Sequence, residues 1–192
     1  MRLAPFLLTL LVLSVVAAAP AAAQSREGVI HPNRGVYLAL GGGAGMQFPA
    51  PVGGASGYPE SAFGFMGELR AGFSLSRTFQ IFLSVDSGGS SQPAGFLQAT
   101  NVLGALRYFL WFDEDLGVYV RGGIGIGFVS YSEWVKDAGK PTTGLSEAGG
   151  LGMEIRLDKG WSLSPEVFYR RTNDSSIFSA DMIGLALLVN FN

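Results

Sequence analysis

The segment Phe63-Gly64-Phe65-Met66-Gly67-Glu68-Leu69-Arg70-Ala71-Gly72-Phe73-Ser74-Leu75 carries the pattern that decides the fold of this chain. Apolar side chains, most of them bulky, occupy nearly every second position, and the charged Glu68 and Arg70 fall between them. A period of two is that of a β-strand, whose successive side chains point to opposite faces of a sheet. The alternation covers the roughly 9 to 11 residues that a tilted membrane-spanning strand needs. The segment therefore predicts a strand with one face toward lipid and one polar face.

Other segments share this pattern, and the 28 glycines favour strands over helices because glycine weakens a helix. No apolar run after the N-terminal region reaches the 18 or so residues that a membrane helix needs. The segment 98–110 is ambiguous because Leu103 and Leu106 both suit a lipid-facing position, so a short buried helix is the alternative there. The eight expected strands are Gly35–Gly45, Phe63–Leu75, Phe79–Asp86, Gln98–Leu110, Leu116–Ser130, Gly144–Leu157, Trp161–Arg170 and Asp181–Phe191.

The connections between these strands alternate between short and long. Tight polar turns are expected at 76–78, 113–115 and 158–160, and long loops at 46–62, 87–97, 131–143 and 171–180. Outer-membrane barrels show this asymmetry, with short periplasmic turns and longer extracellular loops. The sequence predicts an all-β fold, an eight-stranded antiparallel up-and-down transmembrane β-barrel with both termini in the periplasm.

Hairpin register gives an independent check on the faces, because residues opposite each other in an antiparallel pair point the same way. Pairing Leu75 with Phe79 places Arg70 opposite Ser84 and Glu68 opposite Asp86. Pairing Leu157 with Trp161 places Arg156 opposite Ser162 and Glu154 opposite Ser164. Closing the middle turn brings Arg107 opposite Arg121. All three hairpins place the charged residues in the barrel interior.

The N-terminal region has the features of a cleaved signal peptide. A positive Met1-Arg2 precedes an apolar stretch and the small-residue run Ala21-Ala22-Ala23. We expect a signal peptide at 1–23, a short periplasmic segment at 24–34 and the barrel domain at 35–192, with an uncleaved anchor as the alternative. The chain has no cysteine, so disulfides and a lipidated cysteine are excluded.

The last strand, Gly184-Leu185-Ala186-Leu187-Leu188-Val189-Asn190-Phe191, combines a glycine with alternating hydrophobic residues and a late aromatic. In this strand and in its overall pattern the chain resembles the OmpA/OmpX-type family of small, porin-like outer-membrane β-barrels. The resemblance implies that Gly184, Leu187, Val189 and Phe191 form a C-terminal assembly signal. The chain departs from the family pattern at two positions: it ends with Asn192, and it carries Met182 where a polar residue is usual. The implied location is the outer membrane of a Gram-negative bacterium, and the implied partners are its lipid, the barrel-assembly machinery and periplasmic chaperones.

The interior of an eight-stranded barrel is just wide enough to be filled by side chains. Two opposed arginines, Arg107 and Arg121, would repel each other without acidic partners. We expect Glu154, Glu166 and Glu68 to neutralise them and to form a polar plug, with a narrow or gated ion path as the alternative. The predicted interior network consists of Glu68, Arg70, Asp86, Arg107, Arg121, Glu154, Arg156, Glu166 and Arg170.

Catalysis and nucleic-acid binding are disfavoured. The single histidine, His31, precedes the first strand, so the barrel has no histidine for a Ser-His-Asp site or a metal site. Glu154 and Glu166 could serve as an acid/base pair, but ion pairing is the favoured role. The formal net charge of −2 provides no basic patch for nucleic acid. We expect no enzymatic activity, no cofactor and no metal.

The expected function lies in the loops, because loops on a rigid scaffold commonly carry recognition. The first loop mixes prolines with Phe48 and Tyr58, and the third contains Tyr131 and Trp134. A structural or surface-interaction role with an extracellular partner is the leading hypothesis, and a small pore is the second. An exported, soluble lipocalin-like barrel is a distant third, because it would be coated in hydrophobic surface here.

Overall fold

The computed structural model describes residues 35–51, 61–92, 95–133, 142–158, 160–174 and 178–191. The expected signal peptide (1–23), the segment 24–34, His31, Trp134 and Asn192 lie outside the described residues. Within the described ranges, no helix is long and apolar enough to cross a membrane.

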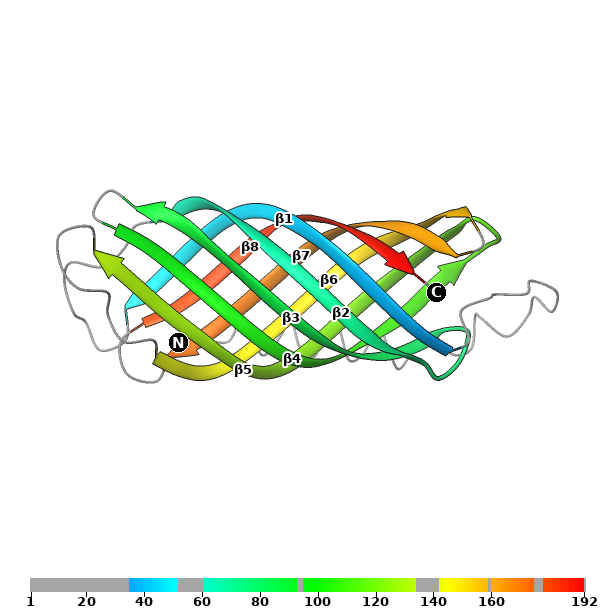
Figure 1. The fold of residues 1–192 in the computed structure, drawn as a ribbon, viewed down its shortest axis with the longest axis horizontal. Coiled ribbons are helices and arrows are strands. Elements are labelled where there is room, and N and C mark those ends of the chain that lie inside the picture. The colour runs from blue at the N-terminus through cyan, green and yellow to red at the C-terminus, as the bar shows by residue number, and fades with distance from the viewer. Residues whose placement is uncertain are drawn as a thin grey trace.

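The described residues form one closed antiparallel barrel in which every strand pairs with its neighbours in the chain. β1 also pairs with β8, which closes the sheet. The tilted strands wrap around an elongated barrel, and the last strand ends beside the start of the first (Figure 1). The predicted eight-stranded up-and-down barrel is confirmed. The strands are β1 (Gly35–Pro51), β2 (Ala62–Ser74), β3 (Phe79–Gln92), β4 (Gly95–Phe112), β5 (Leu116–Glu133), β6 (Thr142–Asp158), β7 (Trp161–Asp174) and β8 (Phe178–Phe191).

The register sets the tilt of the strands. Following cross-strand partners once around the barrel from Leu38 leads to Phe48 on the same strand, ten residues along the chain. For eight strands this stagger corresponds to a tilt of about 40°, within the usual range of roughly 35–45°. Each residue then advances about 2.5 Å along the barrel axis. The row of partners is Leu38, Ala71, Leu83, Gly104, Ile124, Glu147, Arg171, Asp181 and Phe48.

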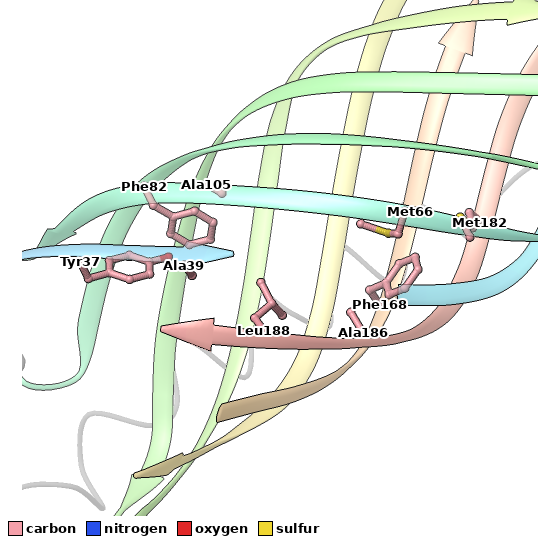
Figure 2. Close-up of a cluster of buried hydrophobic side chains, with 9 residues drawn as sticks. All are labelled: Tyr37, Ala39, Met66, Phe82, Ala105, Phe168, Met182, Ala186 and Leu188. Carbon is pink, nitrogen blue, oxygen red and sulfur yellow. The ribbon is translucent and has the colours of Figure 1, made fainter. Parts of the chain in front are cut away.

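The two faces of the sheet differ as the alternation predicts. On β2, the outward Phe65 is 67% exposed, whereas the adjacent inward Met66 is only 7% exposed. Large apolar side chains on all eight strands face outward in the same way. Inward apolar residues such as Tyr37, Phe82, Phe168 and Leu188 fill part of the interior (Figure 2). The barrel is therefore apolar outside and filled inside.

We call the end of the barrel with the three short connections the turn end, and the opposite end the loop end. Gly35 and Phe191 lie at the turn end, which is the end marked C in Figure 1. At the loop end, Leu97, Ala99, Val129 and Ala180 form a second buried apolar cluster, against which Tyr131 packs. This loop-end cluster lies within a few residues of the strand ends and fills part of the interior on that side.

Several strands extend further toward the loop end than the sequence pattern predicts. The expected long loop 87–97 is wrong, because Ser87–Gln92 and Gly95–Leu97 pair as strands. The expected loop 171–180 is also too long, since β7 runs to Asp174 and β8 begins at Phe178. The outward positions of these extensions include Ser87 and Arg171. Apolar alternation therefore ends before the strands do, which is why the pattern missed the extensions.

Two further details differ from expectation. Segment 98–110 belongs to strand β4 and not to a helix, with Leu103 fully buried inside and Leu106 41% exposed outside. At the last turn, Trp161 pairs with Asp158 and not with Leu157, because a bulge lies between Arg156 and Asp158. The bulge absorbs one residue, so Arg156 still pairs with Ser162 as predicted.

Candidate functional site: the charged interior of the barrel

The inward positions bring eight of the predicted charged residues into the barrel interior. Each of the eight is at most 6% exposed: Glu68, Arg70, Asp86, Arg107, Arg121, Glu154, Glu166 and Arg170. Arg156 is only partly buried, and at the turn end it donates a hydrogen bond from Nη1 to the carbonyl oxygen of Glu114 at 2.5 Å. These eight residues lie on six strands, β2 to β7, and they meet across the barrel interior.

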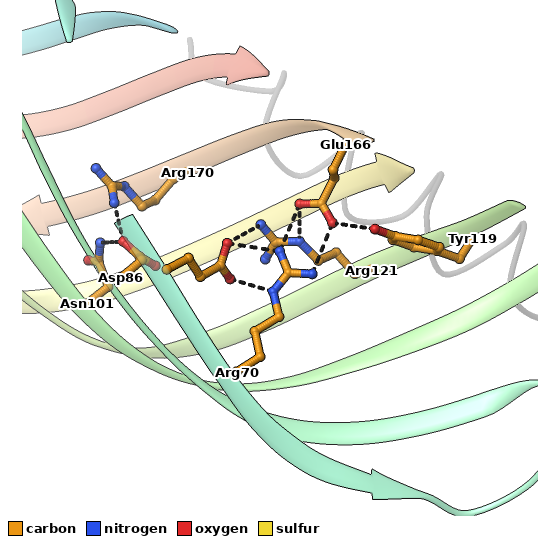
Figure 3. A network of polar contacts seen from close by, with 8 residues as sticks. Arg70, Asp86, Asn101, Tyr119, Arg121, Glu166 and Arg170 are labelled. Atoms are coloured by element: carbon orange, nitrogen blue, oxygen red, sulfur yellow. Dashed lines mark hydrogen bonds and ion pairs between the residues drawn. The ribbon is translucent and has the colours of Figure 1, made fainter. Parts of the chain in front are cut away.

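The central cluster consists of two arginines and two glutamates. Arg70 donates to Glu68 at 2.7 Å and to Glu166 at 3.0 Å. Arg121 pairs with Glu166 at 2.5 Å and with Glu68 at 3.6 Å. Each guanidinium therefore contacts both carboxylates, and the charges cancel. The Tyr119 hydroxyl donates a further hydrogen bond to Glu166 Oε2 at 3.0 Å (Figure 3).

Arg107 occupies an aromatic environment. It lies opposite Arg121 in the register, as predicted, and its Nη1 donates to Glu154 at 3.0 Å. The guanidinium carbon lies 4.3 Å from the centre of the Tyr119 ring and 5.3 Å from that of Tyr37. Within the described part of the chain, Nε and Nη2 of Arg107 have no hydrogen-bond partner. The rings stabilise this cation through their π faces instead.

A third group lies nearer the loop end. Asp86 accepts hydrogen bonds from Arg170 and, at 2.8 Å, from Asn101 (Figure 3). The side-chain oxygen of Asn101 in turn accepts from Ser146 at 2.7 Å and from Thr172 at 2.8 Å. Asp86 on β3 is thus linked, directly or through Asn101, to donors from three other strands, β4, β6 and β7.

The charges of the interior are balanced and buried. Four arginines face four carboxylates, and all eight groups are buried. The loop-end cluster covers the network on one side, where Ser90 also donates to Gln47 at 2.6 Å. Among the described residues, no group of three histidine, aspartate or glutamate side chains could hold a metal ion. The arrangement suits a structural plug.

Each of the three glutamates expected to neutralise Arg107 and Arg121 contacts one of these two arginines. Glu154 lies on Arg107, whereas Glu166 and Glu68 both lie on Arg121. The aromatic and amide partners Tyr37, Tyr119 and Asn101 were not predicted. For Tyr119 the available signal was its inward position two residues from Arg121 on β5, whereas β1, which carries Tyr37, has no charged residue.

The residues of the expected C-terminal assembly signal lie on β8 at the seam with β1. Leu187 and Phe191 point outward and are exposed, and Val189 pairs with Leu40. Gly184 pairs with Gly45, and a Cβ atom on Gly184 would lie 2.2 Å from the carbonyl oxygen of Ala44. Such a contact is impossible without a shift of the backbone. Glycine at 184 is therefore required by the closure of the barrel.

Comparisons with known proteins agree with this architecture. A family model described as "Outer membrane protein beta-barrel domain" matches residues 8–191. Neisserial surface protein A from Neisseria is similar in structure, with a TM-score of 0.62 and 10% sequence identity over 80% of this chain and 96% of that one. The N-terminal β-barrel domain of OprF from Pseudomonas aeruginosa gives a TM-score of 0.51 at 14% identity, covering 82% and 98% of the two chains.

At such low identity these two likenesses concern the fold alone. No curated protein sequence matches the chain significantly. The family model, however, spans the whole barrel, with all eight strands. The chain therefore belongs to the outer membrane protein beta-barrel domain family.

Proposed function

We propose that this outer-membrane barrel is a sealed scaffold that presents its loop end to a partner outside the cell. The observation that carries the proposal is the balanced, fully buried ion network beneath the loop-end apolar cluster. An interior filled in this way leaves the outer surface and the connections as the parts able to meet a partner. Loops held by a rigid framework are well suited to recognition.

The length of the strands supports the same proposal. β4 and β5 each contain 18 residues, which advance roughly 45 Å along the axis at about 2.5 Å per residue. The apolar band of an outer-membrane barrel is only about 25 Å tall. The loop end therefore extends beyond the lipid as paired strands, and the connections start from a rigid base. With the loop end outside, Gly35 and Phe191 at the turn end face the periplasm, where the assembly machinery would meet β8.

A narrow pore is the second candidate, because charged side chains cross the interior from Arg107 to Arg170. Conduction requires ions to pass groups that are already paired, such as Arg121 with Glu166. An acid/base role for Glu154 and Glu166 has little support, since each carboxylate is held by an arginine. A soluble lipocalin-like role does not suit a member of this family whose charges lie inside and whose apolar residues lie outside.

Binding by the loop end is tested with the protein displayed on a Gram-negative host that lacks other adhesins. Residues 52–60, between β1 and β2, and residues 134–141, between β5 and β6, are each replaced by a short Gly-Ser linker. We expect adhesion to a cultured epithelial monolayer to fall several-fold in at least one variant, while both variants still migrate as folded barrels in unboiled gels. Wild-type adhesion by both folded variants, or no adhesion by the parent protein, would contradict surface interaction.

The sealed interior is tested separately by recording purified protein in a planar bilayer. We expect no steady conductance steps from the parent protein. A Glu166→Gln variant, which leaves Arg70 and Arg121 without one carboxylate, serves as the comparison. Reproducible unitary steps from the parent protein would favour the pore.

A further inference from the structure

Three charged residues form a row on the outer surface of the barrel. Glu147 on β6, Arg171 on β7 and Asp181 on β8 are direct cross-strand partners. They occupy outward positions. On each of the three strands, an exposed apolar residue lies an even number of residues away and therefore on the same face: Leu151, Val167 and Leu185. This outer charged row is separate from the buried interior network.

The row lies at a defined height on the barrel. Glu147, Arg171 and Asp181 are each ten residues from an outward apolar residue at the turn end, namely Leu157, Trp161 and Phe191. Ten residues advance about 25 Å along the axis at the tilt given by the register. The apolar band of such barrels is about 25 Å tall, with aromatic residues at both edges. The row therefore lies where the hydrocarbon ends on the loop side.

The energetics of charged groups agree with this height. An arginine or lysine on the lipid face costs about 2–4 kcal/mol at the bilayer midplane and about 0–1 kcal/mol near the interface, and an aspartate or glutamate costs less. Tyr169, two residues from Arg171 on the same face of β7, and the exposed Phe48, the partner of Asp181 on β1, are aromatic residues of the kind found at membrane interfaces. The row is thus placed among lipid headgroups.

The chemistry of Arg171 indicates what it can bind there. Its Nε donates to Asn173 Oδ1 at 2.8 Å and lies 3.6 Å from Asp181 Oδ1. Both contacts use Nε, and the guanidinium also makes a hydrogen bond with the Tyr169 side chain, so the terminal nitrogens keep N–H donors that none of these contacts uses. Asn173 and Tyr169 flank Arg171 on the same outer face and add an amide and a hydroxyl donor. A guanidinium fork with neighbouring donors matches the geometry of a phosphate group.

We propose that Arg171, with Tyr169 and Asn173, binds the phosphate of a lipid A headgroup in the outer leaflet. Asp181 and Asn173 hold the guanidinium through its Nε, which leaves terminal donors for the headgroup layer. The assignment to the outer leaflet rests on the proposed orientation of the loop end. The binding of phosphate by Arg171 does not depend on that orientation, because it can be measured on the purified protein.

Native mass spectrometry of the folded barrel in detergent tests the proposal, with lipid A carrying two phosphates as the probe. Lipid A with the same acyl chains but without phosphate is the matched lipid control. We expect Arg171→Gln to weaken binding of the phosphorylated lipid at least fivefold, to the level of the dephosphorylated lipid. Arg77→Gln at the turn end, which also removes one arginine from the surface, should retain parental binding.

A second variant covers the case in which Arg171→Gln does not fold. Arg171→Lys keeps the positive charge but loses the planar fork, and we expect it to fold and to weaken binding about two- to threefold. Equal binding of the two forms of lipid A, parental binding by a folded Arg171→Gln, or equal losses in the Arg171→Gln and Arg77→Gln variants would overturn the proposal. Failure here leaves the adhesion and conductance results untouched, so the two proposals can fail separately.

Discussion

At the scale of single residues, the interior network joins strands that are far apart around the barrel. Arg70 on β2 contacts Glu166 on β7, and Arg107 on β4 contacts Glu154 on β6. Alternation along each strand predicts that these side chains point inward, and hairpin register predicts that Arg107 faces Arg121. Which glutamate meets which arginine depends on distances across the interior. These distances follow from the stagger of the closed barrel. The stagger cannot be deduced from the pattern of one strand or from the register of one hairpin.

Glu166 should be the most sensitive member of this network. It accepts hydrogen bonds from Arg70, Arg121 and Tyr119, so Glu166→Gln leaves two buried guanidinium groups short of a charged partner. Breaking a buried ion pair in this way costs about 3–5 kcal/mol. We expect a loss of that size in the free energy of unfolding by urea in detergent micelles. Glu114→Gln in the exposed turn is the control, with an expected change within about 0.5 kcal/mol.

Tyr119 has two roles that a pair of variants can separate. Its hydroxyl donates to Glu166, and its ring lies against the guanidinium of Arg107. Tyr119→Phe removes only the hydroxyl, and a hydrogen bond to a charged group contributes about 1.5–3 kcal/mol. Tyr119→Leu also removes the ring face, so its loss of unfolding free energy should be larger by about 1 kcal/mol or more. Equal losses for the two variants would show that the ring does not stabilise Arg107.

At the scale of strands, the sequence pattern predicts the existence and the faces of all eight elements but not their loop ends. The pattern depends on contrast between apolar and polar positions, and this contrast disappears where both faces meet polar surroundings. On β3 it is clear as far as Val85 and is lost from Ser87 onward, although the strand continues to Gln92. For the same reason the sequence pattern predicts a loop at the last residues of β7 and the first of β8.

Glycines on the two faces of the strands should respond differently to substitution. A Cβ atom on Gly184 would lie 2.2 Å from the carbonyl oxygen of Ala44, whereas one on the outward Gly122 would meet no atom within 4 Å. We expect Gly184→Ala to lower sharply the yield of folded barrel and Gly122→Ala to leave it unchanged. The measurement is the fraction that migrates as a folded species in an unboiled gel after refolding in detergent. The refolding assay contains no assembly machinery. A normal yield for Gly184→Ala would therefore mean that Gly184 serves recognition by that machinery and is not needed to close the barrel.

At the scale of the whole molecule, the stagger, the apolar surface and the outer charged row give the same position in the membrane. The turn end lies at one edge of the hydrocarbon, near Trp161 and Phe191, and the charged row lies at the other edge. The strand extensions then form a collar outside the lipid, and the loop-end cluster fills its interior. A barrel shaped in this way holds its loop-end connections away from the membrane surface. The proposed function depends on these connections, so a sealed interior does not interfere with it.

The collar can be located directly by the depth of tryptophan side chains in the bilayer. From Phe79 at the turn end of β3, Leu83 lies about 10 Å along the axis and Ser91 about 30 Å, at roughly 2.5 Å per residue. With the native tryptophans replaced by phenylalanine, Leu83→Trp should be strongly quenched by lipids brominated on their acyl chains. Ser91→Trp should show almost no quenching and a red-shifted emission, because a band about 25 Å tall ends below it. Equal quenching at both positions would place the whole of β3 within the lipid and leave the barrel without a collar.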